Sequence, residues 1–498
     1  MKSRFLNILL ATFLVSATTS CNNLLNITET DFLGGDLALG TVKNNESLLM
    51  GAYSALSARS PGLSYGNGAH EMVILSNGVF SDELKVGDFY NAQTTHEWLF
   101  SADDVSLRDN YNAFANYYRI IDRANRVLAA LPKAVGEGAA DEALRTRLQG
   151  EALFLRAFSH FELFRFYCKS YDPAGLGLIY MKEPSLDNRA RDLMGPYFEN
   201  MVADIETAKG LLADNVNDVY RANKLSAVGL RARVALYMRD WDAAAKNATD
   251  YINALPLATQ TQFPAIWSDA GKTEIAFKIA RTTATPRIGA IYRGLFTKDA
   301  SGNIVPPNSI PWIPSDKLWD SFDQTNDIRF KEYVLDEPIL RNYPGKQSRL
   351  VHKYHGTGYA TTNENVNDLK VFRTGEMYLI RAEARAELGQ VTGANSGESD
   401  LNDLRKARIT GYANQTISSK ETLVTAVLNE RFKELAFEGH RFWDLKRRGL
   451  AVERLVNDSP ATGRTLPAND YHFVLPIPNT EIAGNSLLKQ NDGYASIN

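Results

Sequence analysis

The sequence predicts a mostly α-helical protein made of helical hairpins, interrupted by one large insertion of loops and short strands. Three observations lead to this fold class. Apolar residues recur at helical spacing over 103–131 and 142–168. Small and large residues alternate over 223–254 as they do in two closely packed helices. Between 255 and 370 the helical period is lost and prolines accumulate.

The N-terminus has the pattern of a secretory signal. Lys2 and Arg4 precede an apolar run over 5–15, a patch of small residues follows over 16–20, and Cys21 comes next. The run is too short to span a bilayer as a permanent helix. A cysteine at this position resembles the acylation site of bacterial lipoproteins. We expect 1–20 to be a signal peptide and Cys21 to carry a lipid anchor; the alternative is ordinary secretion with an incidental cysteine.

Composition excludes some classes of function. The 498 residues carry a formal net charge of −3, so the chain has no basic excess for binding nucleic acid. After the signal no run of 18 apolar residues remains that could cross a membrane. The chain has two cysteines, and an acylated Cys21 leaves Cys168 without a disulfide partner. Cys168 lies in an apolar, aromatic stretch, which predicts a buried, inert thiol.

The first half of the chain is read as a tether followed by helices. Residues 21–45 are polar and irregular and predict a lipidated tether. A loop-rich region with several glycines is expected over 60–100, and a connecting loop over 169–191. The helices are expected at about 46–59, 103–131, 142–168, 193–213, 223–238 and 241–254.

The pair 223–254 is similar to a tetratricopeptide helical hairpin. Ala227, Gly229, Ala232 and Ala235 allow close helix approach, and a short turn precedes Trp241. Weaker matches to the same pattern occur at 150–163 and 375–390, but no period of 34 residues repeats. The sequence therefore predicts tetratricopeptide-like hairpins dispersed along the chain.

The insertion over 255–370 contains nine prolines and three of the six tryptophans. Short strands, turns and long loops are expected there, and loops on a rigid scaffold commonly carry binding residues. Helical patterns return at about 372–389, 398–409, 419–438 and 440–448, with Gly439 and Gly449 at positions where helix ends favour glycine.

Residues 430–449 (ERFKELAFEGHRFWDLKRRG) carry the most specific pattern. Glu430, Glu434 and Glu438 recur every four residues, and Arg431, Arg441 and Arg447 are the expected counter-charges of an ion-paired structural joint. The segment closely resembles the C-terminal signature of the SusD/RagB family of Bacteroidetes. Residues 150–157, 378–384, 401–405 and the tail over 475–494 resemble further blocks of the same family.

The resemblance implies a nutrient-uptake lipoprotein of the outer membrane and not an enzyme. Family members bind a ligand and act as the lid of a SusC-like TonB-dependent barrel transporter. Their ligands are typically oligosaccharides, and peptides in some branches. The resemblance implies one SusD-like domain over 46–498, with a helical scaffold at about 46–254 and 371–498 that contacts the transporter and a variable, ligand-facing insertion at about 255–370.

Motifs for covalent chemistry are weak, so we expect no catalytic residue, metal or cofactor. Gly62 to Gly66 satisfies G-x-S-x-G but lacks the flanking strand and helix of a nucleophile elbow. His352 and His355 lack the helical spacing of zinc ligands. Acidic pairs such as Asp82-Glu83 are adjacent in sequence, which does not place them on either side of a glycosidic bond. An exported glycan hydrolase remains the alternative.

Aromatic side chains are the expected ligand-binding residues, because the apolar face of a sugar packs on a flat ring. Core packing is the alternative for each of them. Alanine at Trp312 or Trp319 is expected to weaken ligand binding and leave folding intact. The ligand-binding residues predicted from the sequence are Trp98, Trp267, Tyr292, Trp312 and Trp319.

Overall fold

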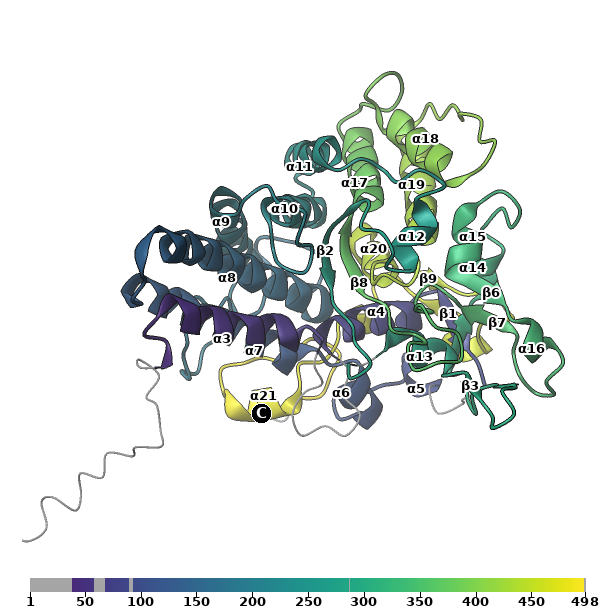
Figure 1. Cartoon of the computed structure of the whole chain (residues 1–498), viewed down its shortest axis with the longest axis horizontal. Helices are drawn as coiled ribbons and strands as arrows, with labels where there is room; N and C mark the ends of the chain where they lie inside the picture. The colour runs from purple at the N-terminus through teal and green to yellow at the C-terminus, as the bar shows by residue number, and fades with distance from the viewer. Residues whose placement is uncertain (1–37, 58–67, 89–92, 286, 497–498) are drawn as a thin grey trace, which may run out of the picture.

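The structure is a computed structural model that describes residues 38–57, 68–88, 93–285 and 287–496. The expected signal peptide, Cys21 and the G-x-S-x-G segment lie outside the described residues. The first long helices lie at one end of the molecule, and the short strands and helices of the insertion lie at the other (Figure 1).

A helical scaffold makes up most of the fold, as predicted. Along the chain, α7 packs on α8, α8 on α9, and α10 on α11, and α17 then packs on both α11 and α18. These contacts form a succession of helical hairpins (Figure 1). The scaffold helices are α3 (Val42–Ala55), α7 (Phe114–Ala130), α8 (Gly138–Tyr167), α9 (Met194–Leu211), α10 (Lys224–Met238), α11 (Trp241–Ala254), α17 (Thr374–Glu387), α18 (Gly397–Arg408), α19 (Lys420–Glu434) and α20 (Arg441–Arg448).

The α10–α11 hairpin shows how local sequence sets these boundaries. Asn223 and Ser226 form a capping box at the start of α10, and Arg239 ends that helix in the left-handed region (φ 60°). Asp240 then accepts a hydrogen bond from the backbone N–H of Ala243 and caps α11. Both helices therefore begin and end within a residue of their predicted positions.

Three predicted boundaries were wrong. Helix α4 (Ala69–Phe80) occupies part of the expected loop over 60–100, and all twelve of its residues are buried. The single helix expected over 103–131 is two helices, α6 (Val105–Asn110) and α7, separated at residues 111–113. Helix α3 begins at Val42, inside the predicted tether, where Thr41 caps it by accepting from the N–H of Asn44.

The insertion contains the expected short strands and, in addition, short helices. Strand β5 pairs with β1 from the scaffold, and β2 pairs with β8, so two antiparallel ladders tie the insertion to the scaffold. The elements between 255 and 373, together with β1, are β1 (Leu84–Val86), α12 (Phe263–Trp267), β2 (Ile275–Ile279), α13 (Ile288–Arg293), β3 (Thr297–Lys298), β4 (Ile304–Val305), β5 (Trp312–Pro314), α14 (Asp316–Trp319), α15 (Ile328–Tyr333), β6 (Val334–Asp336), α16 (Pro338–Arg341), β7 (Arg349–Val351) and β8 (Leu369–Arg373).

Short elements also follow the scaffold helices in the C-terminal region. Strands β9 and β10 form an antiparallel pair, and a final short helix precedes the tail. The remaining elements are α5 (Gln93–His96), η2 (Leu131–Lys133), β9 (Val452–Glu453), η3 (Ala461–Gly463), β10 (Thr465–Leu466), η4 (Tyr471–Phe473) and α21 (Asn479–Gly484).

The predicted ion-paired joint exists, but with different counter-charges. The carboxylate of Glu434 is fully buried and lies 3.1 Å from Arg329, 3.0 Å from Arg373 and 3.1 Å from Arg408. Glu438 pairs with Arg373 at 2.7 Å and with Lys353 at 2.6 Å.

The arginines expected as counter-charges pair with aspartates instead. Arg431 and Arg447 bind Asp444 at 2.7 and 2.8 Å, and Arg441 binds Asp82 at 2.7 Å. Glu434 therefore joins α19 to α15, β8 and α18, and Arg431 joins α19 to α20 through Asp444.

Cys168 is buried at the end of α8, and burial raises the pKa of its thiol, in agreement with the expected inert cysteine. Among the helices of the described residues, none is both long enough and apolar enough to traverse a bilayer.

Candidate functional site

The structure places all five predicted ligand-binding aromatics in the interior. Their exposed fractions range from 0% for Trp267 and Tyr292 to 5% for Trp319. A ring packed on both faces cannot stack on a sugar. Direct ligand contact by these rings therefore stays an untested prediction, and it would require neighbouring residues to move.

Trp98 follows α5 and adopts a positive φ of 56°, which is unusual for a bulky residue. Its indole N–H donates to the carbonyl of Phe80 at 3.0 Å, and the guanidinium of Arg454 lies 4.1 Å from the ring centroid. These contacts fix the ring beneath the surface.

Arg454 and His96 link Trp98 to Trp312, because the guanidinium over the Trp98 ring donates to the carbonyl of His96. In the β1–β5 ladder Trp312 is opposite Val86, and its ring is 5.8 Å from that of His96. Trp319 packs against Phe330 at 4.9 Å and beneath the guanidinium of Arg349 at 4.5 Å.

Trp267 and Tyr292 belong to other parts of the core. Trp267 packs at 5.3 Å against Tyr333 and at 4.3 Å from the ammonium of Lys353, beside the ionic joint. Tyr292 packs at 5.9 Å against Phe437. The structure thus links two of the five predicted residues, Trp98 and Trp312.

A surface cavity of about 270 Å³ lies next to Trp98 and Trp312. We call it the β1 cavity; its lining is Lys85, Val86, His96, Glu97 and residues 456–460. Glu97 is adjacent to Trp98 in sequence, and Val86 and His96 both contact Trp312. The buried rings of Trp98 and Trp312 therefore lie behind the cavity, and other side chains form its surface.

The β1 cavity combines charged and apolar groups. The ammonium of Lys85 lies 2.6 Å from Asp316 and 3.7 Å from Asp458. Asp458 also accepts from the backbone N–H groups of Asp316 and Lys317, and burial raises the pKa of its carboxyl. The hydroxyl of Thr462 donates to Glu97.

Exposed apolar side chains stand beside these polar groups. Val456 is 69% exposed in the cavity wall, and Leu455 next to it is 46% exposed. A hydroxylated ligand with apolar faces needs this combination of donors, acceptors and apolar surface.

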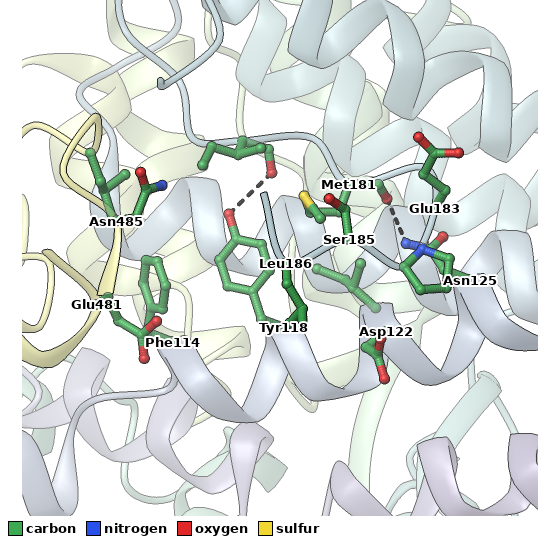
Figure 2. A pocket seen from close by; sticks show the side chains of 14 residues that line it. Phe114, Tyr118, Asp122, Asn125, Met181, Glu183, Ser185, Leu186, Glu481 and Asn485 are labelled. Atoms are coloured by element: carbon green, nitrogen blue, oxygen red, sulfur yellow. Dashed lines mark hydrogen bonds between the residues drawn. The ribbon is translucent and has the colours of Figure 1, made fainter. Parts of the chain in front are cut away.

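A second cavity of about 380 Å³ lies on the scaffold, between α7, the loop over 179–186 and the α21 region. Figure 2 shows Tyr118 and Asn125 of α7 reaching toward the loop, which two hydrogen bonds hold to α7. Tyr118 donates to the carbonyl of Ile179 at 3.1 Å, and Asn125 to that of Met181 at 3.0 Å.

The charged side chains of this second cavity are all carboxylates: Asp122, Glu183 and Glu481. Burial raises the pKa of Glu481. The cavity pairs a mainly apolar floor with acceptors, and the described residues that line it include no lysine, arginine or histidine. The β1 cavity fits a polyhydroxylated ligand better.

The described residues offer no group of three metal-ligating side chains. His352 and His355 stack on one another with centroids 4.0 Å apart, and burial lowers the pKa of both. Asp82 is held by Arg441 and Lys317, while burial raises the pKa of its neighbour Glu83 to about 8. Each of these groups therefore has a packing or ion-pairing role.

Two family models match this chain. The model described as "SusD family" matches residues 341–494, and the one described as "Starch-binding associating with outer membrane" matches residues 65–236. The chain belongs to the SusD/RagB family. The first match includes the ionic joint, and the second includes part of the β1 cavity wall.

Relatives of this SusD-family chain extend over most of its length. SusD-like protein P38 of Formosa agariphila is 25% identical over 426 residues, which cover 77% of this chain and 80% of that protein. The starch-binding protein SusD of Bacteroides thetaiotaomicron is 34% identical over 209 residues, 36% of each chain.

Solved structures share the fold. A SusD superfamily protein from Bacteroides thetaiotaomicron superposes with a TM-score of 0.76 at 24% identity and covers 91% of this chain and 99% of its own. A laminarin-binding SusD-like protein gives 0.68 at 21% identity, with 91% and 99% covered. At these identities the likeness concerns the fold alone.

The sequence did not single out Lys85, Glu97 or Asp458. The sequence positions of Glu97 and Lys85 could have pointed to these two residues. Glu97 is adjacent to Trp98, and Lys85 lies in the short segment after the Asp82-Glu83 pair. Asp458 comes from a loop more than 350 residues further along, and only the fold brings it to the same cavity.

Proposed function

We propose that this SusD-family chain is a lipid-anchored outer-membrane protein that binds oligosaccharide and closes as a lid over a SusC-like TonB-dependent transporter. Family membership is the observation that carries the proposal. The names of its relatives support the ligand class, because one is a starch-binding protein and one structural neighbour binds laminarin. The name of one family model supports an outer-membrane location.

In this proposal the ligand binds at the β1 cavity. Lys85 donates to sugar oxygens, Glu97 accepts from hydroxyls, and Val456, with Leu455 beside the cavity, covers the apolar C–H faces. The buried carboxylate of Asp458 holds the Lys85 ammonium in place. The chain performs no covalent chemistry on the sugar. Cys21 carries the lipid, the protein is exposed at the cell surface, and the helical scaffold contacts the transporter.

Calorimetric titration of the mature, delipidated chain with oligosaccharides derived from starch and laminarin, and with a peptide panel, tests the ligand class. We expect saccharide binding that Lys85→Ala and Glu97→Gln weaken about tenfold, equivalent to about 1.4 kcal/mol. Lys43→Ala, which removes an exposed lysine from α3, is the matched control and should bind like the wild type. Peptide binding without saccharide binding would place the chain in a peptide-binding branch.

Incubation with polysaccharides and a reducing-end assay tests the absence of catalysis. Turnover that survives purification would favour a glycan hydrolase.

Purification of the chain from membranes of its native host tests the partner. A TonB-dependent barrel should copurify, and Cys21→Ser should release the protein from the membrane fraction. A Cys21→Ser protein that stays membrane-bound would contradict the lipid anchor. A protein that never associates with a barrel would contradict the role as a lid.

A further inference from the structure

A third cavity lies beside the C-terminal tail. This C-terminal cavity measures about 730 Å³, within the range of small-molecule binding sites. Its walls are the loop over 169–176, the start of α9, Lys446 at the end of α20, and residues 468–474 and 490–492. It shares no lining residue with the β1 cavity.

Specific bonds hold the tail in place as one wall. The guanidinium of Arg191 donates to the side-chain oxygen of Asn491 at 2.8 Å, and the Asn491 amide donates to the carbonyl of Leu475 at 2.8 Å. Lys169 and Asp492 pair at 2.7 Å with both side chains largely exposed. The cavity is therefore preformed, which lowers the entropic cost of binding a ligand.

An exposed aromatic ring lines this cavity, unlike the buried rings near the β1 cavity. Tyr471 is 40% exposed. Tyr494 meets it edge-on, with centroids 4.9 Å apart and an interplanar angle of 85°. The His472 ring also packs on Tyr471, with centroids 3.9 Å apart. These two contacts orient the Tyr471 ring, and Leu176, Met194 and Phe473 add apolar surface to the same cavity.

The charged groups of the lining balance. Three are cationic (Lys169, Arg191 and Lys446) and three are anionic (Asp172, Asp470 and Asp492). Lys169 is neutralised by Asp492, and Lys446 donates to the carbonyls of Arg165 and Cys168 at the end of α8. Asp470 accepts from the His472 ring at 2.7 Å.

This balance favours an uncharged ligand. Side-chain amides of Asn469, Gln490 and Asn491 also line the cavity. Carboxylates, amides and ammonium groups around an exposed ring match the hydroxyls and C–H faces of a neutral sugar.

We infer that the C-terminal cavity is a second binding site, for a neutral saccharide, with Tyr471 as its stacking platform. The inference rests on saccharide binding by this chain but adds a site separate from the β1 cavity. A chain with two such sites holds a long glycan at two points, which raises its effective affinity for polymers over short fragments.

Hydrogen–deuterium exchange of the mature chain, with and without excess maltoheptaose or laminarihexaose, distinguishes the two sites. Saccharide should slow exchange over 468–474 and 490–494 at the C-terminal cavity, and over 84–86 and 456–460 at the β1 cavity. At a saccharide concentration near the wild-type dissociation constant, Tyr471→Ala should reduce the first protection and keep the second, and Lys85→Ala should do the reverse.

Two further variants separate stacking from folding. Tyr471→Phe keeps the ring and should retain protection of the tail, whereas Tyr471→Ala should weaken binding there about tenfold. Tyr343→Ala removes an equally exposed tyrosine of the insertion and should leave the tail protected. Unchanged tail exchange with normal protection of the β1 cavity would overturn the second site and leave the proposed function standing. Absence of protection at both sites would overturn both.

Discussion

Trp312 shows at the residue scale why a tryptophan in a proline-flanked loop need not be a ligand platform. The residue belongs to β5, and its pairing with β1 directs the ring into the interior, where it is 3% exposed. Burying an indole stabilises the fold more than most other side chains would. The sequence shows the ring and the flanking prolines, but not the strand partner that buries it.

Trp312→Ala should therefore destabilise the protein, contrary to the expectation from sequence that folding would be unaffected. Removing a buried tryptophan commonly costs about 3–5 kcal/mol of unfolding free energy. Denaturant unfolding followed by far-UV circular dichroism measures the loss. Trp241→Ala, which truncates a partly exposed tryptophan of α11, is the comparison and should cost clearly less. Equal, small losses in both variants would contradict the burial of Trp312.

Glu83 gives a residue-scale prediction on pH. Burial and, next, the charge of Asp82 raise the pKa of its carboxyl to about 8, against the opposing effects of the Phe437 N–H, Lys353 and Arg441. The folded state thus keeps a proton that the unfolded chain loses near its ordinary pKa of 4.5. Stability from this group is fully present below pH 4.5 and is lost as the pH rises to about 8.

The test compares the wild type with Glu83→Gln, in which the side chain is always neutral. The unfolding free energy of the variant relative to the wild type should rise between pH 5 and 8, by at most about 1.4 kcal/mol per pH unit. Other titrating groups affect both proteins alike, so the difference reports Glu83. A difference that stays flat over this range would contradict a proton held on Glu83.

At the scale of elements, some helices follow from local sequence and others do not. The α10–α11 hairpin is predictable because Asn223 and Asp240 supply side-chain caps at the first turns of the two helices. Helix α4 is not, because every one of its residues is buried and it has no polar face to reveal a helical period. Gly78 inside it also looks like a loop residue, although it is there because Leu84 packs against it.

The ion-paired joint shows that some side-chain contacts also follow from local sequence and others do not. The four-residue spacing of Glu430, Glu434 and Glu438 predicts one helix face, and this is confirmed for the first two within α19. Their partners come from α15, β8 and α18, and only the fold brings these together. The β1 cavity is similar: Glu97 adjoins a predicted residue, whereas Asp458 requires the tertiary structure.

Glu434→Gln should be strongly destabilising. Burial would raise the pKa of this carboxyl, but Arg408, Arg373 and Arg329 outweigh it and lower the pKa. Loss of the charge leaves three buried guanidinium groups short of a counter-ion, which commonly costs about 3–5 kcal/mol. Because the folded pKa is depressed, the stabilisation is present above pH 4.5 and is lost as the pH falls through the folded pKa.

Chemical denaturation at pH 7 measures this cost. Glu421→Gln alters an exposed carboxylate in the first turn of the same helix and should change the unfolding free energy by less than about 0.5 kcal/mol. Similar values for the two variants would show that the buried network contributes no more than a surface charge.

At the scale of the whole molecule, part of the insertion shares a core with the scaffold, and a smaller cluster that includes Phe296, Ile313 and Leu350 lies within the insertion itself. One hydrophobic cluster includes Val42 near the start of the described chain, Trp267 and Trp319 in the insertion, and Leu488 in the tail. The β2–β8 ladder and the ion pairs of Glu434 cross the same boundary. A binding surface on the insertion is therefore held in place by its packing against the scaffold helices.

Unfolding should accordingly be a single transition, as the expected single domain over 46–498 requires. Far-UV circular dichroism reports mainly the scaffold helices, and tryptophan fluorescence includes Trp267, Trp312 and Trp319 of the insertion. Equilibrium denaturation curves from the two probes should coincide, because neither part can lose its packing without exposing the shared core and the buried charges. In Glu434→Gln both curves should shift together to lower denaturant concentration. A fluorescence transition that precedes the loss of helix would instead show that the insertion unfolds on its own.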